Sequence, residues 1–184
     1  MKKIAIQGIQ GAFHEQAARA YFQTEEVEII PHLRFDELIA SLMSGKTDYG
    51  VMAIENTLIG KLSKNEALIQ QNPIEIQGEY SLKITLCLGA LPGVKMDEIR
   101  TVYSQPEALE QCVEFFQENP KIEPVERADT ALSAYKVAQL KSRQLGAIAS
   151  ELALEKYGLK ILIRSIQDQP KNYTRFLILK KAKL

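Results

Sequence analysis

The feature that most constrains the fold is the alternation of strand and helix patterns along the chain. Residues 2–7 have three apolar residues, Ile4, Ala5 and Ile6, at their centre and are typical of a strand. Residues 8–11 contain two glycines, and residues 13–22 have the spacing of an amphipathic helix. A second strand is expected at 27–30 and a second helix at 35–42. Strands that alternate with helices predict sheets covered by helices, which is the α/β class.

The alternation stops at a β-rich stretch and then resumes, which indicates two lobes. Two extended runs are expected at 74–76 and 80–88, after a buried strand at 48–54. The later strands are expected at 101–103, 122–125, 146–148, 159–163 and 174–179, and the later helices at 109–116, 131–138 and 150–157. A cleft between two such lobes is the default binding site.

Composition argues against several classes of partner. Lys plus Arg and Asp plus Glu are 23 each, so the formal net charge is 0 and nothing in it favours nucleic acid. The hydrophobic fraction is 46% and no apolar run approaches the ~18 residues of a membrane span, so no membrane partner is expected. The basic start is followed by too few apolar residues for a secretory signal, and a cytoplasmic protein is expected.

Neither cysteine nor histidine spacing indicates a metal site or a disulfide. Cys87 and Cys112 lack CxxC spacing and are expected to be reduced, buried thiols. His14 and His32 are not spaced as metal partners, so no metal is expected. The turn at 8–11 lacks the dinucleotide fingerprint and is either a structural turn or an anion site at a helix start.

Charged residues stand at the ends of two apolar strands. Glu55 follows one strand, and Arg175 lies at the start of the last one. An arginine there needs a carboxylate partner or a bound anion, and Glu55 likewise needs a cationic partner. The two side chains pair with each other, or each faces a ligand.

Polar residues also precede two expected helices. Asp129 and Thr130 begin a helix, and capping of its first amides is a sufficient explanation for them. Pro106 suits the first turn of another helix, and capping would also explain Ser104. Capping does not explain Gln111, which lies one to two turns further on.

Five segments are distinctive when taken together and in order. They are residues 7–13, 54–57, 104–112, 128–131 and 166–176, the last of which ends in Asn-Tyr-Thr-Arg-Phe. Their order and spacing span nearly the whole chain, and they resemble the catalytic domain of prephenate dehydratases.

This resemblance implies a fold and an activity. The implied fold has two α/β lobes with a central cleft, like type II periplasmic-binding proteins, with residues 1–76 and 163–184 in one lobe and 77–162 in the other. Together they would form one catalytic domain, without the phenylalanine-binding ACT domain into which relatives continue. The implied lyase converts prephenate to phenylpyruvate, water and carbon dioxide in phenylalanine biosynthesis, needs no cofactor, and is expected to be a homo-oligomer, either a dimer or a tetramer.

The resemblance also implies the site residues. The implied catalytic residues are Glu55, Asn56, Ser104, Gln111 and Thr174, and the implied substrate-binding residues are Gly11, Ala12, Thr57, Asp129, Thr130, Arg175 and Phe176. We expect Arg175 to bind a carboxylate, Thr174 to donate a hydrogen bond to the departing hydroxyl, and Glu55 to orient these groups. Glu55 is the alternative acid, if burial raises its pKa against the effect of Arg175. Asn56, Ser104 and Gln111 would fix the substrate by neutral hydrogen bonds.

Three positions depart from the family pattern. Gln105 and Leu86 stand where relatives often have histidine, and Lys61 replaces a serine. Lys61 either binds a substrate carboxylate or is solvated. Two alternatives remain open: a decarboxylase that leaves the ring non-aromatic, and a non-catalytic module that binds a small carboxylate. Prephenate and arogenate are not distinguished as substrates.

Overall fold

In the computed structural model, which describes residues 1–23 and 25–183, the chain divides into two compact units. The first unit contains Met1–Lys83 and Asn172–Leu184, and the second contains Ile84–Lys171. These boundaries differ from the expected ones at residues 76 and 163. Strand β5 (Ile74–Lys83) stays with the first unit because it pairs along its whole length with β11 (Tyr173–Lys181).

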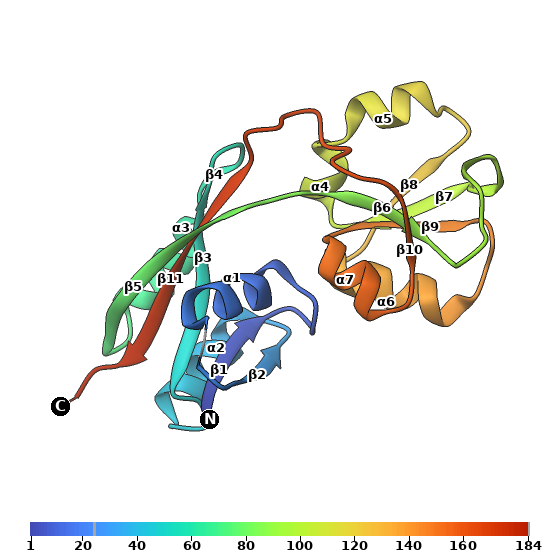
Figure 1. Ribbon diagram of the computed structural model, residues 1–184. Coiled ribbons are helices and arrows are strands. Elements are labelled where there is room, and N and C mark those ends of the chain that lie inside the picture. Colours follow the sequence, from blue (N-terminus) through green and yellow to red (C-terminus); the bar gives the residue numbers. More distant parts are fainter. Residues whose placement is uncertain (24, 184) are drawn as a thin grey trace. The chain divides into compact units, whose positions relative to one another are not determined.

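The first unit is built on a six-stranded sheet with the order β2-β1-β3-β11-β5, and β4 pairs with β3. Its other strands are β1 (Lys2–Gln7), β2 (Val27–His32), β3 (Tyr49–Asn56) and β4 (Gly60–Lys61), and its helices are α1 (Phe13–Phe22), α2 (Phe35–Met43) and α3 (Ser63–Gln70). β1 is parallel to β2 and β3, whereas β11 runs antiparallel between β3 and β5 (Figure 1). The end of β3 therefore lies beside the start of β11.

Alternating residues of this sheet face two hydrophobic clusters, one on each side. Ile4 and Phe176 pack in the cluster that contains residues of α1, and Ala5 and Leu177 pack in the cluster that contains residues of α2. Helix α1 therefore covers one face of the sheet and α2 covers the other.

The second unit is built on a five-stranded sheet with the order β10-β6-β9-β7-β8. Its strands are β6 (Cys87–Ala90), β7 (Thr101–Ser104), β8 (Glu123–Glu126), β9 (Leu145–Ala149) and β10 (Lys160–Ile163). Its helices are η1 (Met96–Glu98, a 3₁₀ turn), α4 (Pro106–Glu110), α5 (Val113–Glu118), α6 (Thr130–Leu140) and α7 (Glu151–Lys156). β7 is parallel to β8 and β9, and β6 is antiparallel to β9 and β10.

Two expected elements are wrong in detail. The runs at 74–76 and 80–88 are one ten-residue strand, β5, which is followed by the separate strand β6. The single helix expected at 109–116 is two helices, α4 and α5. Helix α3 and strand β4 are not among the elements predicted from the sequence.

The break between α4 and α5 is caused by Asp168. Its carboxylate accepts hydrogen bonds from the backbone N–H groups of Val113 and Glu114, at 2.9 and 3.1 Å. Its own N–H donates to the carbonyl of Gln111 at 2.7 Å. The start of helix α5 is thus capped by a carboxylate from a distant part of the chain.

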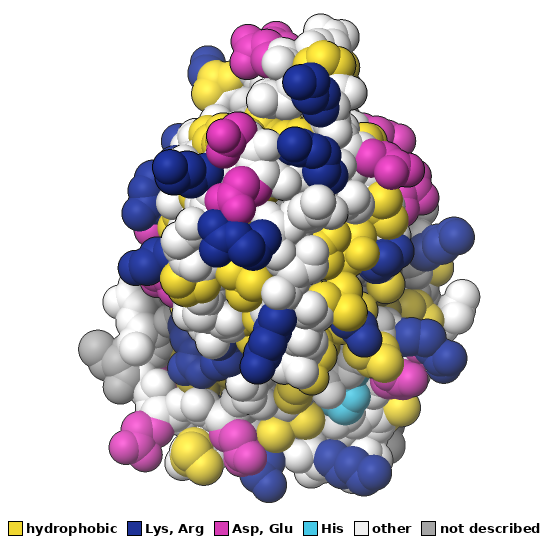
Figure 2. All heavy atoms as spheres, turned by 90° about the vertical axis from the view of Figure 1, so that its right-hand side faces the viewer, with side chains coloured by type: hydrophobic (Ala, Val, Ile, Leu, Met, Phe, Trp, Pro, Cys, Tyr) yellow, Lys and Arg dark blue, Asp and Glu magenta, His cyan; other side chains and the backbone are white. Residues whose placement is uncertain are grey.

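No helix in the described part of the chain combines the length and the apolar character that crossing a membrane requires. Cys87 and Cys112 are free and buried, as expected, and burial raises the pKa of Cys112 to about 12. Charged side chains of both signs are interspersed on the face shown in Figure 2.

Candidate functional site

Four of the expected site residues meet where β3 ends and β11 begins, in the first unit. The antiparallel register places Thr174 opposite Asn56 and Arg175 opposite Glu55. A β-bulge follows Arg175, and bulges redirect the side chains beside them. The topology therefore brings two pairs to the same end of the two strands, the amide of Asn56 with the hydroxyl of Thr174 and the carboxylate of Glu55 with the guanidinium of Arg175, and we call this region the β3–β11 junction.

Asn56 is the centre of the hydrogen bonding at this junction. Its Oδ1 accepts from the backbone N–H groups of Leu58 and Ile59, at 2.9 and 3.1 Å. Its Nδ2 donates to Oδ1 of Asn172 at 2.8 Å and to Oγ1 of Thr174 at 2.9 Å. These bonds fill both acceptor and both donor positions of the amide, whose residue is 6% exposed. Asn56 therefore holds the loop and Thr174, instead of presenting an unused polar group.

Thr57 continues the pairing beyond the last residue of β3. Its N–H donates to the carbonyl of Tyr173 at 2.9 Å, and its Oγ1 accepts from the N–H of Tyr173 at 3.0 Å. The hydroxyl oxygen of Thr57 thus helps to fix the residue that precedes Thr174.

Arg175 forms ion pairs with two carboxylates. Its Nε and Nη2 donate to Oε2 of Glu55 at 3.2 and 3.0 Å, and its Nη1 donates to Oε2 of Glu79 at 3.2 Å. The hydrogen bond with Glu55 is the main cause that raises the pKa of Arg175. The three side chains are between 38% and 61% exposed, so water screens these pairs. The pairing of Arg175 with Glu55, left open by the sequence, is thus present and accessible to a competing anion.

Glu55 lies between two basic residues in the strand register. Arg175 on β11 is opposite it on one side, and Lys61 on β4 is opposite it on the other. Lys61 is exposed. Positive charge therefore flanks the end of β3 on both neighbouring strands.

The glycine turn before α1 already holds a carboxylate of the chain itself. Gly11 donates its N–H to Oε2 of Glu15 at 2.7 Å, and Arg19 donates to Oε1 of the same carboxylate at 2.8 Å. Glu15 is only 3% exposed. Ala12, the residue before α1, is buried as well. Of the two interpretations of this turn, the structure favours the structural one.

His14 is buried against the core of the first unit. Its ring lies 4.9 Å from that of Phe176 between centroids, and its Nε2 accepts from the N–H of Ala53 at 3.4 Å. Burial lowers the pKa of His14 to about 3, so the ring is neutral. Within the described residues, no group of three or more His, Cys, Asp or Glu side chains is arranged to hold a metal ion.

The remaining expected residues lie in the second unit. Ser104 is fully buried, and its hydroxyl donates to the carbonyl of Ile148 at 2.7 Å, which joins β7 to β9. The residue that caps α4 is Gln105, so capping does not explain Ser104. Gln111 is half-buried in the break between α4 and α5, where Asp168 binds its carbonyl.

Asp129 caps helix α6, as the sequence suggested. Its Oδ1 accepts from the N–H of Leu132 at 2.7 Å, and Thr130 is the buried first residue of the helix. Leu86, which stands at a family histidine position, is 1% exposed and lies in the core.

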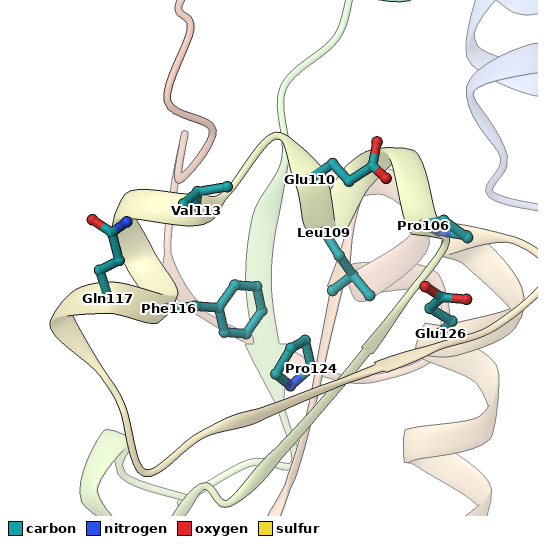
Figure 3. A pocket seen from close by; sticks show the side chains of 8 residues that line it. All are labelled: Pro106, Leu109, Glu110, Val113, Phe116, Gln117, Pro124 and Glu126. Carbon is teal, nitrogen blue, oxygen red and sulfur yellow. The ribbon is translucent and has the colours of Figure 1, made fainter.

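A hollow of about 460 Å³ in the second unit contains none of the expected site residues. It is lined by Pro106, Leu109, Glu110, Val113, Phe116, Gln117, Pro124 and Glu126. Figure 3 shows the side chains of Leu109, Phe116 and Pro124 directed toward one another. Because this hollow is mainly apolar and its only ionisable side chains are acidic, it does not suit a dicarboxylate.

Sequence reasoning missed three residues that shape the site. Glu79 reaches Arg175 only because β5 pairs with β11, which no local pattern shows. Glu15 occupies the glycine turn, and an acidic residue in the first helical turn was the available signal. Asn172 belonged to a distinctive segment, but its bond to Asn56 depends on the strand pairing.

Comparisons with known proteins point in one direction. The family model described as prephenate dehydratase matches residues 4–184. An Arabidopsis thaliana protein named arogenate dehydratase/prephenate dehydratase 1, chloroplastic, is 38% identical over 177 residues, which are 96% of this chain and 44% of that protein. The bifunctional chorismate mutase/prephenate dehydratase of Escherichia coli K12 is 35% identical over 181 residues, 96% of this chain and 46% of that protein. The chain spans about half the length of these relatives.

Solved structures agree on the fold. A prephenate dehydratase from Arthrobacter aurescens, solved with L-Phe, has a TM-score of 0.89 at 26% identity, over 99% of this chain and 61% of that one. A structure titled GqqA, a novel type of quorum quenching acylases, has a TM-score of 0.89 at 31% identity, over 100% of this chain and 65% of that one. A periplasmic substrate-binding protein from Coxiella burnetii, at 12% identity and a TM-score of 0.51, covers 98% of this chain and 85% of its own. The fold is α/β and of the periplasmic-binding-protein kind.

Proposed function

Because this chain belongs to the prephenate dehydratase family, we propose that it catalyses the decarboxylating dehydration of prephenate to phenylpyruvate, a step of phenylalanine biosynthesis. The observation that carries the proposal is the β3–β11 junction, where the hydroxyl of Thr174 lies next in sequence to the guanidinium of Arg175. One is a hydrogen-bond donor and the other is a cation suited to a carboxylate.

The reaction defines what the protein has to supply. Prephenate carries two carboxylates, and its ring loses one of them as carbon dioxide. The electron pair of that carbon–carbon bond enters the ring, and the hydroxyl across the ring departs with its bonding pair and takes up a proton to become water. Aromatisation drives both steps, so the protein needs to stabilise charge on the leaving oxygen and to bind the carboxylates.

Thr174 suits the role of donor to the leaving oxygen. Its hydroxyl is a weak acid, but a hydrogen bond from it strengthens as negative charge develops on the departing oxygen. Arg175 suits a substrate carboxylate, because its exposed pairs with Glu55 and Glu79 are easily exchanged. Glu55 orients the guanidinium through two of its N–H groups.

The acylase named among the structural relatives suggests a different chemistry, and one observation argues against it here. An acylase that uses a hydroxyl nucleophile needs a base that accepts its proton. Thr174 instead accepts a hydrogen bond from Asn56, and Ser104 gives its proton to a backbone carbonyl. Neither hydroxyl is arranged as an activated nucleophile.

The test is an assay of the purified chain with product identification. With prephenate, we expect phenylpyruvate, which is recognised by its ultraviolet absorbance in alkali. A non-aromatic product would indicate the decarboxylase, and calorimetric binding without consumption would indicate the binding module. Parallel reactions with arogenate and with an acylated quorum signal establish which substrate is preferred. Hydrolysis of the acylated signal, with no conversion of prephenate or arogenate, would overturn the proposal.

Two further properties follow from the same proposal. We place this chain in a homo-oligomer, a dimer or a tetramer, with prephenate as its small-molecule partner, and in the cytoplasm. Light scattering on the purified protein measures the oligomeric state, and fractionation of the source cells measures the location.

A further inference from the structure

The amide of Asn56 can have only one orientation. The backbone N–H groups of Leu58 and Ile59 lie 2.9 and 3.1 Å from one end of this amide, and an N–H group can only donate. The end that faces them is therefore the oxygen, Oδ1. The amino group, Nδ2, must face the opposite way.

This orientation decides the direction of the next hydrogen bond. Nδ2 carries two protons and donates them to Oδ1 of Asn172 at 2.8 Å and to Oγ1 of Thr174 at 2.9 Å. Asn172 is completely buried. Thr174 is thus the acceptor in its bond with Asn56, and its own proton has to point elsewhere. Within residues 1–23 and 25–183, no protein atom accepts that proton.

We infer that Asn56 and Asn172 are positioning residues that leave the proton of the Thr174 hydroxyl available for donation to a substrate, the role that the proposed function requires of it. A threonine hydroxyl usually rotates to suit its surroundings. Here two backbone amides fix Asn56, and Asn56 fixes the acceptor side of Oγ1. A donor that is already aimed needs little reorganisation when charge develops on the leaving oxygen. The inference rests on the proposed function.

Asn56→Asp tests the direction of this bond while changing the shape of the side chain very little. One carboxylate oxygen still accepts from the N–H groups of Leu58 and Ile59. The other oxygen is now an acceptor that faces Thr174, so the hydroxyl proton turns toward the protein. We expect kcat to fall by about 10²-fold or more, while KM changes less than about threefold. Thr174→Val should then cost little more in this background.

Asn65→Asp is the matched control. Asn65 is also 6% exposed and lies in the same unit, and its Nδ2 donates to the carbonyl of Ala53 at 2.8 Å. Asn65 is hydrogen-bonded to neither Asn56 nor Thr174. We expect this variant to lower the thermal midpoint about as much as Asn56→Asp does, because each buries a carboxylate, but to keep kcat close to that of the wild type.

Variants of Asn172 provide a second test, which is informative even if the Asn56→Asp variant does not fold. Asn172→Asp keeps an oxygen for Nδ2 of Asn56, whereas Asn172→Ala removes it. We expect Asn172→Asp to retain several times the kcat of Asn172→Ala. This rescue separates positioning from simple support of the structure.

Three outcomes would overturn the inference. They are a folded Asn56→Asp enzyme with kcat within about threefold of the wild type, an equal loss of kcat in Asn65→Asp, and a rise of KM alone, which would mean that Asn56 binds substrate directly. Failure of the proposed function looks different, because the wild-type chain would then form no phenylpyruvate.

Discussion

Asp168 donates its backbone N–H to the carbonyl of Gln111 at 2.7 Å, and this bond joins two segments that are far apart in the sequence. The carboxylate of the same residue caps helix α5 through Val113 and Glu114. Asp168 therefore contacts the chain directly after α4 and caps the start of α5, and it holds Gln111, one of the two residues that lie between these helices. The position of Gln111 is therefore stabilised by a residue that lies in neither α4 nor α5.

Asp168→Ala keeps the backbone N–H that binds Gln111 but removes the carboxylate that caps α5. It is expected to destabilise the protein by about 1 kcal/mol, and to lower kcat/KM because the start of α5, which follows Gln111 closely, is no longer held. The control is Ser150→Ala, since Ser150 caps α7 and both α5 and α7 are six residues long. Urea unfolding and steady-state kinetics measure both effects. Equal activity of the two variants would mean that Asp168 acts on stability alone.

Arg175→Lys and Arg175→Ala should both raise KM for prephenate by about tenfold or more, because lysine keeps the charge but loses the planar, two-pronged contact with a carboxylate. Arg164→Ala removes another exposed arginine, which is paired with Glu151, and should leave KM unchanged. Steady-state kinetics on the three variants provides the measurement. If both Arg175 variants stay within about twofold of the wild type in kcat/KM, another group binds the carboxylate.

Thr174→Val removes the hydroxyl and keeps the β-branched shape, so kcat should fall by about 10²-fold or more with little change in binding. Thr174→Ser keeps the donor and should retain a substantial part of the rate. Turnover and thermal midpoint are measured on both variants. A folded, fully active Thr174→Val enzyme would show that Thr174 only supports strand pairing and would transfer the donor role to Glu55.

His14 makes the free energy of unfolding depend on pH. Burial lowers its pKa to about 3, from 6.5 in an unfolded chain, so the unfolded state binds more protons between these values. The stability contributed by neutral His14 is complete above pH 6.5 and is lost as the pH falls toward 3.

His14→Gln should therefore flatten the pH dependence of stability between about pH 6.5 and 4, by up to 1.4 kcal/mol for each pH unit. Urea unfolding at a series of pH values checks this, with His32→Gln as the comparison, since the pKa of His32 is also lowered by burial but the residue is only half-buried. An unchanged slope in His14→Gln would mean that His14 titrates normally in the folded protein.

Local periodicity was enough to predict much of the fold, and it failed where distant residues decide the structure. The apolar spacing of α1 and the capping by Asp129 are local, and both predictions hold. The break between α4 and α5 depends on Asp168, which lies 55 residues from Val113 in sequence. No window of neighbouring residues contains that information.

The candidate site shows the same division. Thr174 and Arg175 stand out in the sequence because they open an apolar strand. The direction of the hydrogen bond to Thr174 depends on the orientation of Asn56, which is set by the backbone of the following loop. Hydrogen-bond direction follows from three-dimensional placement, so no motif could have predicted it.

The central position of β11 has a consequence for how this chain acquires its structure. The second unit, Ile84–Lys171, is one continuous segment whose five strands pair with one another. The first unit cannot complete its sheet before β11 has been made. Glu55 and Arg175 are 120 residues apart in sequence, and β5 has no other strand partner in the described chain. During synthesis, the β3–β11 junction therefore forms only after the ribosome has released the residues of β11. A newly made chain acquires its proposed donor and its proposed carboxylate-binding group in the same event that completes its first sheet.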